Sequence, residues 1–202
     1  MLTDLFLKML NREASSPERG AVRILDSLRI TEGQTIADIG SGGGYFTLEF
    51  ARRVGGSGRV FAVDSKRKYL DFIRRQSEQA GLDNIQFILA KSGGVRLPAS
   101  SVDLIFARNV FHHLPEPAEY FGNLGAALKP GGRVAIIDHM PNRGLSFVSL
   151  FRHFTPVEKI RGAMEAAGYV LLESFDFLPS QSFMIFRRSA ADEKGAKNED
   201  GR

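Results

Sequence analysis

Short runs of almost continuously apolar residues recur along the chain, with enough residues between them to form helices. Parallel strands that are covered on both faces of a sheet have this pattern, whereas half-exposed strands alternate apolar and polar residues. We therefore predict five parallel strands, at residues 35–39, 59–64, 84–90, 102–107 and 133–138.

The segments between these runs carry apolar residues three or four positions apart, which predicts helices at residues 45–54, 65–80 and 117–128. Ser65 is a candidate N-cap of the second helix, and Gly81 suits its C-terminal end. The third helix is expected to end before a Lys-Pro-Gly-Gly turn at residues 129–132. This alternation of strands and helices implies right-handed crossovers and a doubly wound α/β sheet.

The C-terminal part of the chain has a different pattern. A helix that opens at Thr155-Pro156 and closes at Gly168 is followed by two strand-like runs, at residues 169–177 and 182–188. The residues between these runs, 178–181, are too few for a parallel crossover, so we expect an antiparallel hairpin. A parallel sheet that ends in one antiparallel hairpin is an unusual combination and narrows the choice of fold.

The chain of 202 residues is long enough for one domain with its own core, which we expect at residues 1–188. Residues 1–30 are expected to form N-terminal helices, the first of them amphipathic rather than a signal peptide. Residues 189–202 lack large apolar side chains and predict a disordered tail. The aromatic segment 143–154 suggests a lid over an apolar substrate or, equally, an ordinary helix that faces the core.

Composition and charge exclude several kinds of site. The chain has no cysteine, which excludes disulfides, thiolate metal sites and a cysteine nucleophile. No run approaches the roughly 20 apolar residues of a membrane span, and we expect a cytoplasmic protein. The net charge is +4, but Lys and Arg are scattered, which argues against nucleic acid as a partner. A small or lipid-like substrate is expected, and a homodimer stays open.

The first predicted strand ends in a glycine-rich turn, Asp38-Ile-Gly40-Ser41-Gly42-Gly-Gly44. Such turns bind nucleotide-like ligands because glycine lets the ligand approach the backbone closely. A dinucleotide fingerprint needs a third glycine where this chain has Tyr45. A ligand with an amino-acid end, a sulfonium and no phosphate suits the turn better, because Asp38 can receive its ammonium group directly or through water.

The second predicted strand ends at Asp64, about 20 residues beyond the glycine turn. An acid at that distance is suited to bind the two hydroxyls of a ribose. Asp38, the glycine turn and Asp64 together predict a site for S-adenosylmethionine. The alternative for Asp64 is a structural acid at a helix N-terminus.

Four segments carry a resemblance to a known family: ADIGSGGGYFT at 37–47, VFAVDSK at 60–66, LPASSVDLIFARNVFHHL at 97–114 and LKPGGRVAIIDHMP at 128–141. Over residues 19–188 the chain resembles the class I S-adenosylmethionine-dependent methyltransferases, particularly the ubiquinone- and menaquinone-biosynthesis group. The resemblance implies a three-layer, Rossmann-like, mostly parallel sheet of seven strands. The implied strand order is 3-2-1-4-5-7-6, with strand seven antiparallel.

The resemblance implies that the glycine turn lines the methionine portion of the cofactor and that Asp64 binds the ribose. Family members commonly have Gly-Asp-Ala after strand three, where this chain has Lys91-Ser92. Adenine would then be held by backbone groups, by Ser92 or by packing. The complete set of expected cofactor-binding residues is Asp38, Gly40, Ser41, Gly42, Gly44, Tyr45, Asp64, Ser65, Lys66, Ser92, Arg108 and Asn109.

The histidines all follow the fourth predicted strand, where ligands bind in open α/β sheets: His112, His113, His139 and His153. Histidine is the natural general base near neutral pH when an acceptor must lose a proton. We expect His139 to be the best candidate base, with His112 and His113 after it; packing within a loop is the alternative for His113. A three-histidine metal site would lack a carboxylate and a helical spacing, so no metal is expected.

The sequence thus predicts methyl transfer from S-adenosylmethionine to a small or lipid-like acceptor at oxygen, nitrogen or carbon. Alignment of the reacting atoms can supply much of the rate of such an in-line displacement. Two alternatives stay open, a non-catalytic S-adenosylmethionine-binding module and an RNA methyltransferase. A nicotinamide-dependent oxidoreductase is disfavoured by Tyr45 and by the terminal hairpin.

Overall fold

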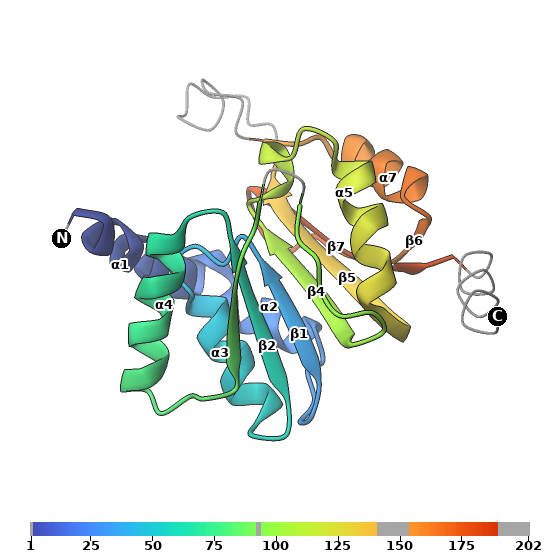
Figure 1. The fold of residues 1–202 in the computed structure, drawn as a ribbon. Helices are drawn as coiled ribbons and strands as arrows, with labels where there is room; N and C mark the ends of the chain where they lie inside the picture. The colour runs from blue at the N-terminus through green and yellow to red at the C-terminus, as the bar shows by residue number, and fades with distance from the viewer. Residues whose placement is uncertain (1, 92–93, 141–153, 190–202) are drawn as a thin grey trace, which may run out of the picture. The chain divides into compact units, whose positions relative to one another are not determined.

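The computed structural model describes residues 2–91, 94–140 and 154–189. Its strands form one sheet in the order β3-β2-β1-β4-β5-β7-β6 (Figure 1). Strands β5 and β7 pair antiparallel, as do β6 and β7, whereas the pairs β1–β2, β2–β3 and β4–β5 are parallel. The predicted seven-stranded α/β sheet is therefore confirmed, with strands β1 (Thr35–Ile39), β2 (Arg59–Asp64), β3 (Ile85–Leu89), β4 (Val102–Arg108), β5 (Leu128–His139), β6 (Tyr169–Phe175) and β7 (Gln181–Arg188).

The chain divides into two compact units, Met1–Val95 and Arg96–Arg202. The first unit holds β1, β2 and β3. Its helices are α1 (Leu2–Ser15), the 3₁₀ turn η1 (Pro17–Arg19), α2 (Ala21–Ser27), α3 (Tyr45–Val54) and α4 (Arg67–Gln79). The prediction of one domain over residues 1–188 stays a prediction, and the predicted lid and tail lie almost wholly outside the described residues.

The core of the first unit follows from the apolar runs read in the sequence. Ile36, Ala37 and Ile39 of β1 are buried, and so is most of β2. In α4, Leu70 and Ile73 are three positions apart and Ser77 follows four positions later, so one buried face runs along the helix. These faces position the glycine turn between β1 and α3.

One helix boundary in the first unit differs from the prediction. Helix α4 begins at Arg67 rather than at Ser65, and its N-cap Lys66 makes no side-chain capping bond. The Lys66 amide donates to Oδ1 of Asp64, 2.9 Å away, and this bond ties the start of α4 to the end of β2. Helix α1 ends at Ser15, within the predicted helical region 1–30, and Leu7 is its buried residue.

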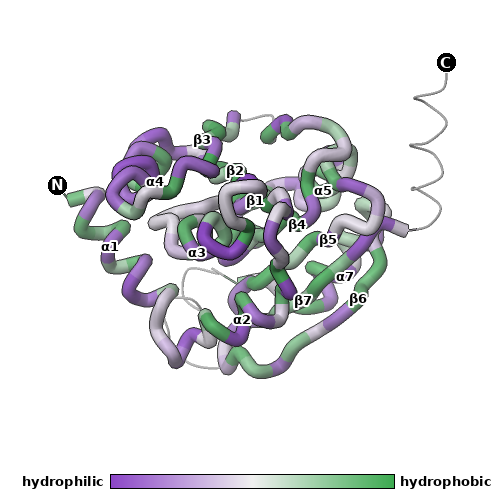
Figure 2. Tube along the Cα trace, turned by 90° about the horizontal axis from the view of Figure 1, so that it is seen from below, coloured by the Kyte–Doolittle hydropathy of each residue, from purple (hydrophilic) through white to green (hydrophobic). Residues whose placement is uncertain are grey.

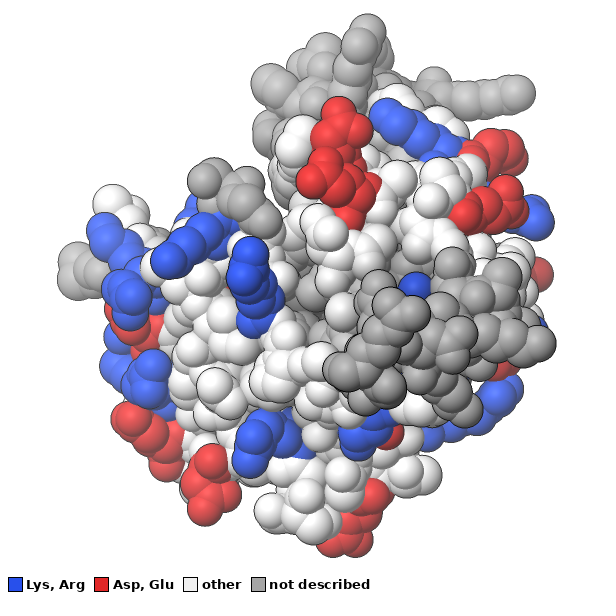
Figure 3. All heavy atoms as spheres, turned by 45° about the vertical axis from the view of Figure 1, so that its right-hand side comes forward, with Lys and Arg blue, Asp and Glu red and all other residues white. Residues whose placement is uncertain are grey.

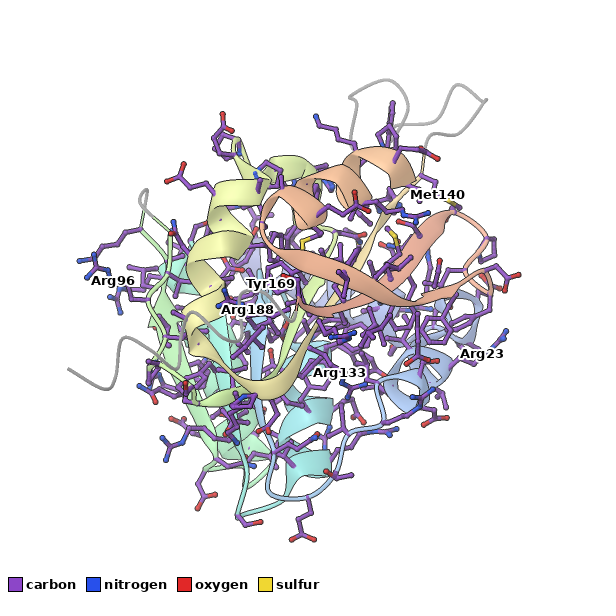
Figure 4. The ribbon with its side chains drawn as sticks, turned by 90° about the vertical axis from the view of Figure 1, so that its right-hand side faces the viewer. Arg23, Arg96, Arg133, Met140, Tyr169 and Arg188 are labelled. Carbon is purple, nitrogen blue, oxygen red and sulfur yellow. The ribbon has the colours of Figure 1, made fainter. Side chains whose placement is uncertain are left out.

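The second unit holds β4 to β7 with η2 (Phe111–His113), α5 (Pro117–Leu124), η3 (Gly125–Ala127) and α7 (Val157–Ala166). Figure 1 shows α5 and α7 side by side over this part of the sheet. Strand β7 is buried from Gln181 to Phe186, as befits a strand between two partners. Tyr169 and Arg188 are register partners in β6 and β7, and Figure 4 shows them close together.

The helix predicted at residues 117–128 ends earlier than expected. Its regular part stops at Leu124, η3 follows, and Leu128 already belongs to β5, opposite Val102 of β4. A Cβ at Gly125 would lie 3.1 Å from the Tyr169 hydroxyl and 3.0 Å from Arg188, so the chain passes closely over these side chains there. The predicted turn at 129–132 is a bulged part of β5, with Gly131 at a φ of 76°.

None of the helices in the described part of the chain is both long and apolar enough to cross a membrane.

Candidate active site

The glycine turn that follows β1 is tied to the end of β2 by backbone hydrogen bonds. The amides of Gly40 and Ser41 both donate to the Val63 carbonyl, at 2.8 and 3.0 Å. Gly40, Gly42 and Gly44 have φ values of 68°, 55° and 84°, a region that glycine adopts without strain. At Gly44 the need is also steric, because a Cβ would lie 2.6 Å from a side-chain carbon of Ile73. The turn can therefore bring its backbone close to a ligand.

Asp64 connects this turn to the start of α4. The Gly42 amide donates to Oδ2 of Asp64 at 3.0 Å, and the Lys66 amide donates to Oδ1 at 2.9 Å. Burial raises the pKa of the Asp64 carboxyl, although these backbone amides and Lys66 act in the opposite direction. Each carboxylate oxygen can accept more than one hydrogen bond, so this structural role leaves acceptor capacity for ligand hydroxyls.

Asp38 is a buried carboxyl beneath the glycine turn. Thr47 of α3 donates its hydroxyl to Oδ2 of Asp38 at 2.5 Å. Desolvation raises the pKa of Asp38 from 3.8 to about 7; the Thr47 bond opposes this and the nearby Asp64 adds to it. A buried acid with a strongly perturbed pKa next to a ligand-binding turn is a typical feature of functional sites.

Asn11 of α1 holds the turn from the other side, and the sequence reasoning missed it. Its Nδ2 donates to the Gly43 carbonyl at 2.7 Å, and its Oδ1 accepts the Tyr45 amide at 3.2 Å. The Tyr45 amide is one of the first amides of α3, which lack partners within the helix, and the N-cap Gly44 has no side chain to supply one. Asn11 thus caps α3 from a distant segment of the chain.

The turn also contains a buried hydroxyl that fits a polar ligand. The Oγ atom of Ser41 is inaccessible to solvent and has no hydrogen-bond partner among the described residues. A buried polar atom without a partner costs free energy, which a ligand with a hydrogen-bonding amino-acid end would recover. The residues present therefore fit the amino-acid end of S-adenosylmethionine.

Lys91 and Gly94 are the described residues on either side of the position after β3 where the family commonly has an acid. Lys91 and Gly94 exchange two backbone hydrogen bonds, at 2.9 and 3.2 Å, and Gly94 has a φ of 94°. Ser92 lies outside the described residues. Ser65 is exposed, and the Nζ of Lys66 lies 3.2 Å from the Tyr69 hydroxyl.

In the second unit, the end of β4 carries a polar network. Arg108 donates through Nη2 to Oε1 of Gln181 at 3.1 Å, and Nε2 of Gln181 donates to Oδ1 of Asn109 at 2.5 Å. Asn109 has a φ of 56°, which is uncommon for a residue other than glycine. Gln181 is buried at the start of β7, so the expected pair Arg108 and Asn109 is held by a third residue that the sequence reasoning missed.

The most organised polar group of the second unit surrounds Asp138, which is completely buried at the end of β5. Its Oδ1 lies 2.7 Å from Nδ1 of His112 and accepts the His139 amide at 2.9 Å. Its Oδ2 accepts the His112 amide at 2.9 Å and the Thr155 hydroxyl at 3.0 Å. Asp138 therefore fixes the orientation of the His112 imidazole through Nδ1.

The three candidate histidines are brought together at this point of the second unit. The ring centroids of His112 and His113 are 4.0 Å apart, and those of His112 and His139 are 6.5 Å apart. The ring of His112 is hydrogen-bonded to Asp138, whereas His139 donates to this carboxylate through its backbone amide. Over the described ranges, no group of three His, Asp or Glu side chains is arranged to hold a metal ion.

Comparison with known proteins points to one family. The model of a family described as "Methyltransferase domain" matches residues 30–176, well over half of the chain. A solved S-adenosylmethionine-dependent methyltransferase from Aquifex aeolicus has the same fold, with a TM-score of 0.81 at 22% identity; the similarity covers 91% of this chain and 97% of that one.

Curated relatives show the same similarity over shorter stretches. The arsenite methyltransferase of Halobacterium salinarum is 32% identical over 106 residues, 52% of this chain and 27% of the relative. The ubiquinone/menaquinone biosynthesis C-methyltransferase of Escherichia fergusonii is 26% identical over 115 residues, 56% of this chain and 46% of the relative. The match thus spans less than half the length of either relative. The match to the family model over residues 30–176 shows that this chain belongs to the methyltransferase-domain family.

Proposed function

We propose that this chain transfers the methyl group of S-adenosylmethionine to a small or lipid-like acceptor at oxygen, nitrogen or carbon, with His112 as the general base. The observation that carries the proposal is the pair of His112 and the buried Asp138, 2.7 Å apart, in a chain of this family. This pair replaces His139 as the best candidate for the base, because Asp138 orients the ring of His112.

Residues of the first unit would hold the cofactor. Gly40, Ser41, Gly42 and Gly44 would surround its amino-acid end, where the Ser41 hydroxyl gains a partner. Asp38 would stabilise the ammonium group, which favours the charged form of this carboxyl. Asp64 would accept hydrogen bonds from the ribose hydroxyls while it still receives the amides of the turn and of α4. When bound, the cofactor supplies an electrophilic methyl group on a sulfonium.

The His112–Asp138 pair would remove the proton that an acceptor loses as its new bond to carbon forms. Nδ1–H of His112 donates to Asp138, and Nε2 accepts the proton from the acceptor hydroxyl, amine or acidic carbon. The positive charge that develops on the imidazole is stabilised by the Asp138 carboxylate at 2.7 Å. Thr155 and the two histidine amides keep that carboxylate in place.

The nature of the acceptor is narrowed by composition. Trivalent arsenic prefers soft thiolate ligands, and these 202 residues contain no cysteine. These residues therefore offer no thiolate that could bind arsenite, and this favours an organic acceptor. Cytoplasmic location and dimer formation stay predictions.

The test of the proposed function is S-adenosylhomocysteine formation by the purified chain with a panel of phenols, quinols and amines. We expect turnover with at least one acceptor. His112→Gln should lower kcat by about a hundredfold or more, with the affinity for the cofactor unchanged. Glu119→Gln, an exposed change on α5, is the control. Turnover of the His112→Gln variant at the rate of the unmodified chain would contradict the assignment of the base.

A further inference from the structure

One face of α1 carries apolar side chains that protrude from the first unit. Leu2, Leu5, Phe6 and Met9 are 85%, 67%, 42% and 55% exposed. Their spacing of three, one and three positions places them in a single stripe along the helix. The opposite face packs inward through the buried Leu7 and through Asn11, so α1 is anchored while this stripe faces outward. Figure 2 shows the alternation of hydrophobic and hydrophilic segments along α1.

A group of cations lies directly beside this stripe. Lys66, Arg67 and Lys68 at the start of α4 are all exposed, and Lys8 of α1 is exposed as well. A hollow between the two helices is lined by Leu2, Thr3 and Phe6 on one side and by residues 66–69 on the other. Figure 3 shows Lys and Arg side chains gathered on its left, the side on which α1 and α4 lie in Figure 1.

Two acids lie close to these cations in the sequence: Asp64, which is buried and interacts with Lys66, and the half-buried Asp71 of α4. Asp4 of α1 is paired with Arg75 of α4 at 2.9 Å, and Glu13 is paired with Arg19 at 2.6 Å. At the apolar edge of the hollow, the rings of Phe6 and Tyr69 are 6.5 Å apart, and Nζ of Lys66 lies 4.7 Å from the centre of the Tyr69 ring. The surface therefore combines an apolar stripe, an aromatic pair and several cations.

We infer that this surface docks on an anionic phospholipid bilayer. A helix that lies in the membrane interface buries an apolar stripe at the level of the headgroups, while basic residues beside it meet the anionic lipid phosphates. The stripe Leu2–Leu5–Phe6–Met9 supplies the apolar part, and Lys66, Arg67 and Lys68 supply the charge. A second copy of the chain would bring the same cations face to face, which disfavours a dimer through this surface.

This docking surface goes beyond the methyl transfer proposed above and is tested without any turnover. The probe is co-sedimentation of the chain with vesicles of phosphatidylcholine that contain about one third phosphatidylserine, against vesicles of pure phosphatidylcholine. We expect binding to the anionic vesicles that is at least about tenfold stronger and that falls as salt is added.

Two pairs of substitutions separate the contributions of apolar surface and of positive charge to vesicle binding. Leu5→Gln with Met9→Gln removes apolar surface, and Arg67→Glu with Lys68→Glu reverses charge; each pair should weaken binding to anionic vesicles by about tenfold or more. Val22→Gln is the matched control, because Val22 is 65% exposed but lies on α2, outside the surface. Circular dichroism establishes that each variant is folded.

Three results would overturn the inference. The first is no sedimentation of the folded chain with anionic vesicles, and the second is equal binding to both kinds of vesicle. The third is a concentration-dependent dimer that Leu5→Gln with Met9→Gln dissociates while vesicle binding is absent, since a second copy would then cover the stripe.

Discussion

Replacing Asp38 by Asn should make the cofactor-free protein more stable, and more so as the pH rises. The folded chain holds this carboxyl at a pKa of about 7 because of its burial, whereas the unfolded chain returns it to 3.8. At 1.36 kcal/mol per pH unit, the difference amounts to about 4 kcal/mol against folding once the pH is well above 7. Asn keeps an oxygen that accepts the Thr47 hydroxyl but carries no charge.

The direction of this pH dependence follows from proton binding at Asp38. Between pH 3.8 and about 7 the folded state binds more protons at Asp38 than the unfolded state does, so the contribution of this group to stability falls as the pH rises. Asp38 therefore lowers the free energy of unfolding by about 1.5 kcal/mol at pH 5 and by about 4 kcal/mol at pH 8. The stability of Asp38→Asn relative to the unmodified chain should therefore increase by about 2.5 kcal/mol between these pH values.

The assay is urea unfolding followed by far-ultraviolet circular dichroism at both pH values, for the two chains side by side. Thr47→Ser, which keeps the hydroxyl donor, is the control and should retain the pH dependence of the unmodified chain. Asp38→Asn should also bind S-adenosylmethionine more weakly if the carboxyl receives its ammonium. A stability difference that stays constant from pH 5 to pH 8 would refute the assignment of a raised pKa to Asp38.

Substitutions at three further positions test the residues that form and hold the cofactor site. Asp64→Ala should weaken S-adenosylhomocysteine binding by about 1–3 kcal/mol in calorimetry, since hydrogen-bonded partners are left unsatisfied; an unchanged affinity would show that Asp64 does not bind the ligand. Asn11→Ala should lower the free energy of unfolding by about 0.5–2 kcal/mol through the lost cap of α3 and should also weaken S-adenosylhomocysteine binding. Asn11→Asp, which keeps the acceptor for Tyr45, should lose less, and equal losses in both variants would contradict the capping role. Gly44→Ala should destabilise the fold by about 1–3 kcal/mol in urea unfolding, because of its φ of 84° and the contact with Ile73; full stability would refute the steric argument.

The strands could be predicted because burial on both faces leaves a direct mark in the sequence. The runs at β1 and β2 have the predicted bounds, and the short link between β6 and β7 gave the antiparallel pairing. The ends of the helices were harder, because they depend on contacts with distant residues. The predicted N-cap was Ser65, whereas α4 begins at Arg67 with Lys66 as its N-cap, and the Lys66 amide donates to Asp64.

The parts of the site that the sequence did not reveal are those made by tertiary contacts. Asn11 contacts the glycine turn from 32 positions away in the sequence. The local sequence indicates this contact only weakly, because Asn11 is a polar residue on the same side of α1 as the buried Leu7. Asp138 stands at the end of a predicted strand directly before His139, a signal that could have been read. Gln181 would have been found if the start of β7 had been placed beside the ends of β4 and β5.

The most direct test of the central claim is a calorimetric titration of the folded chain with S-adenosylmethionine. We expect saturable binding of one ligand per chain, with a proton released from Asp38 at a pH just below 7, since the ligand ammonium favours the charged carboxylate. The proton release appears as a heat that depends on the buffer and should vanish in Asp38→Asn. Absence of binding by the folded chain would contradict the account.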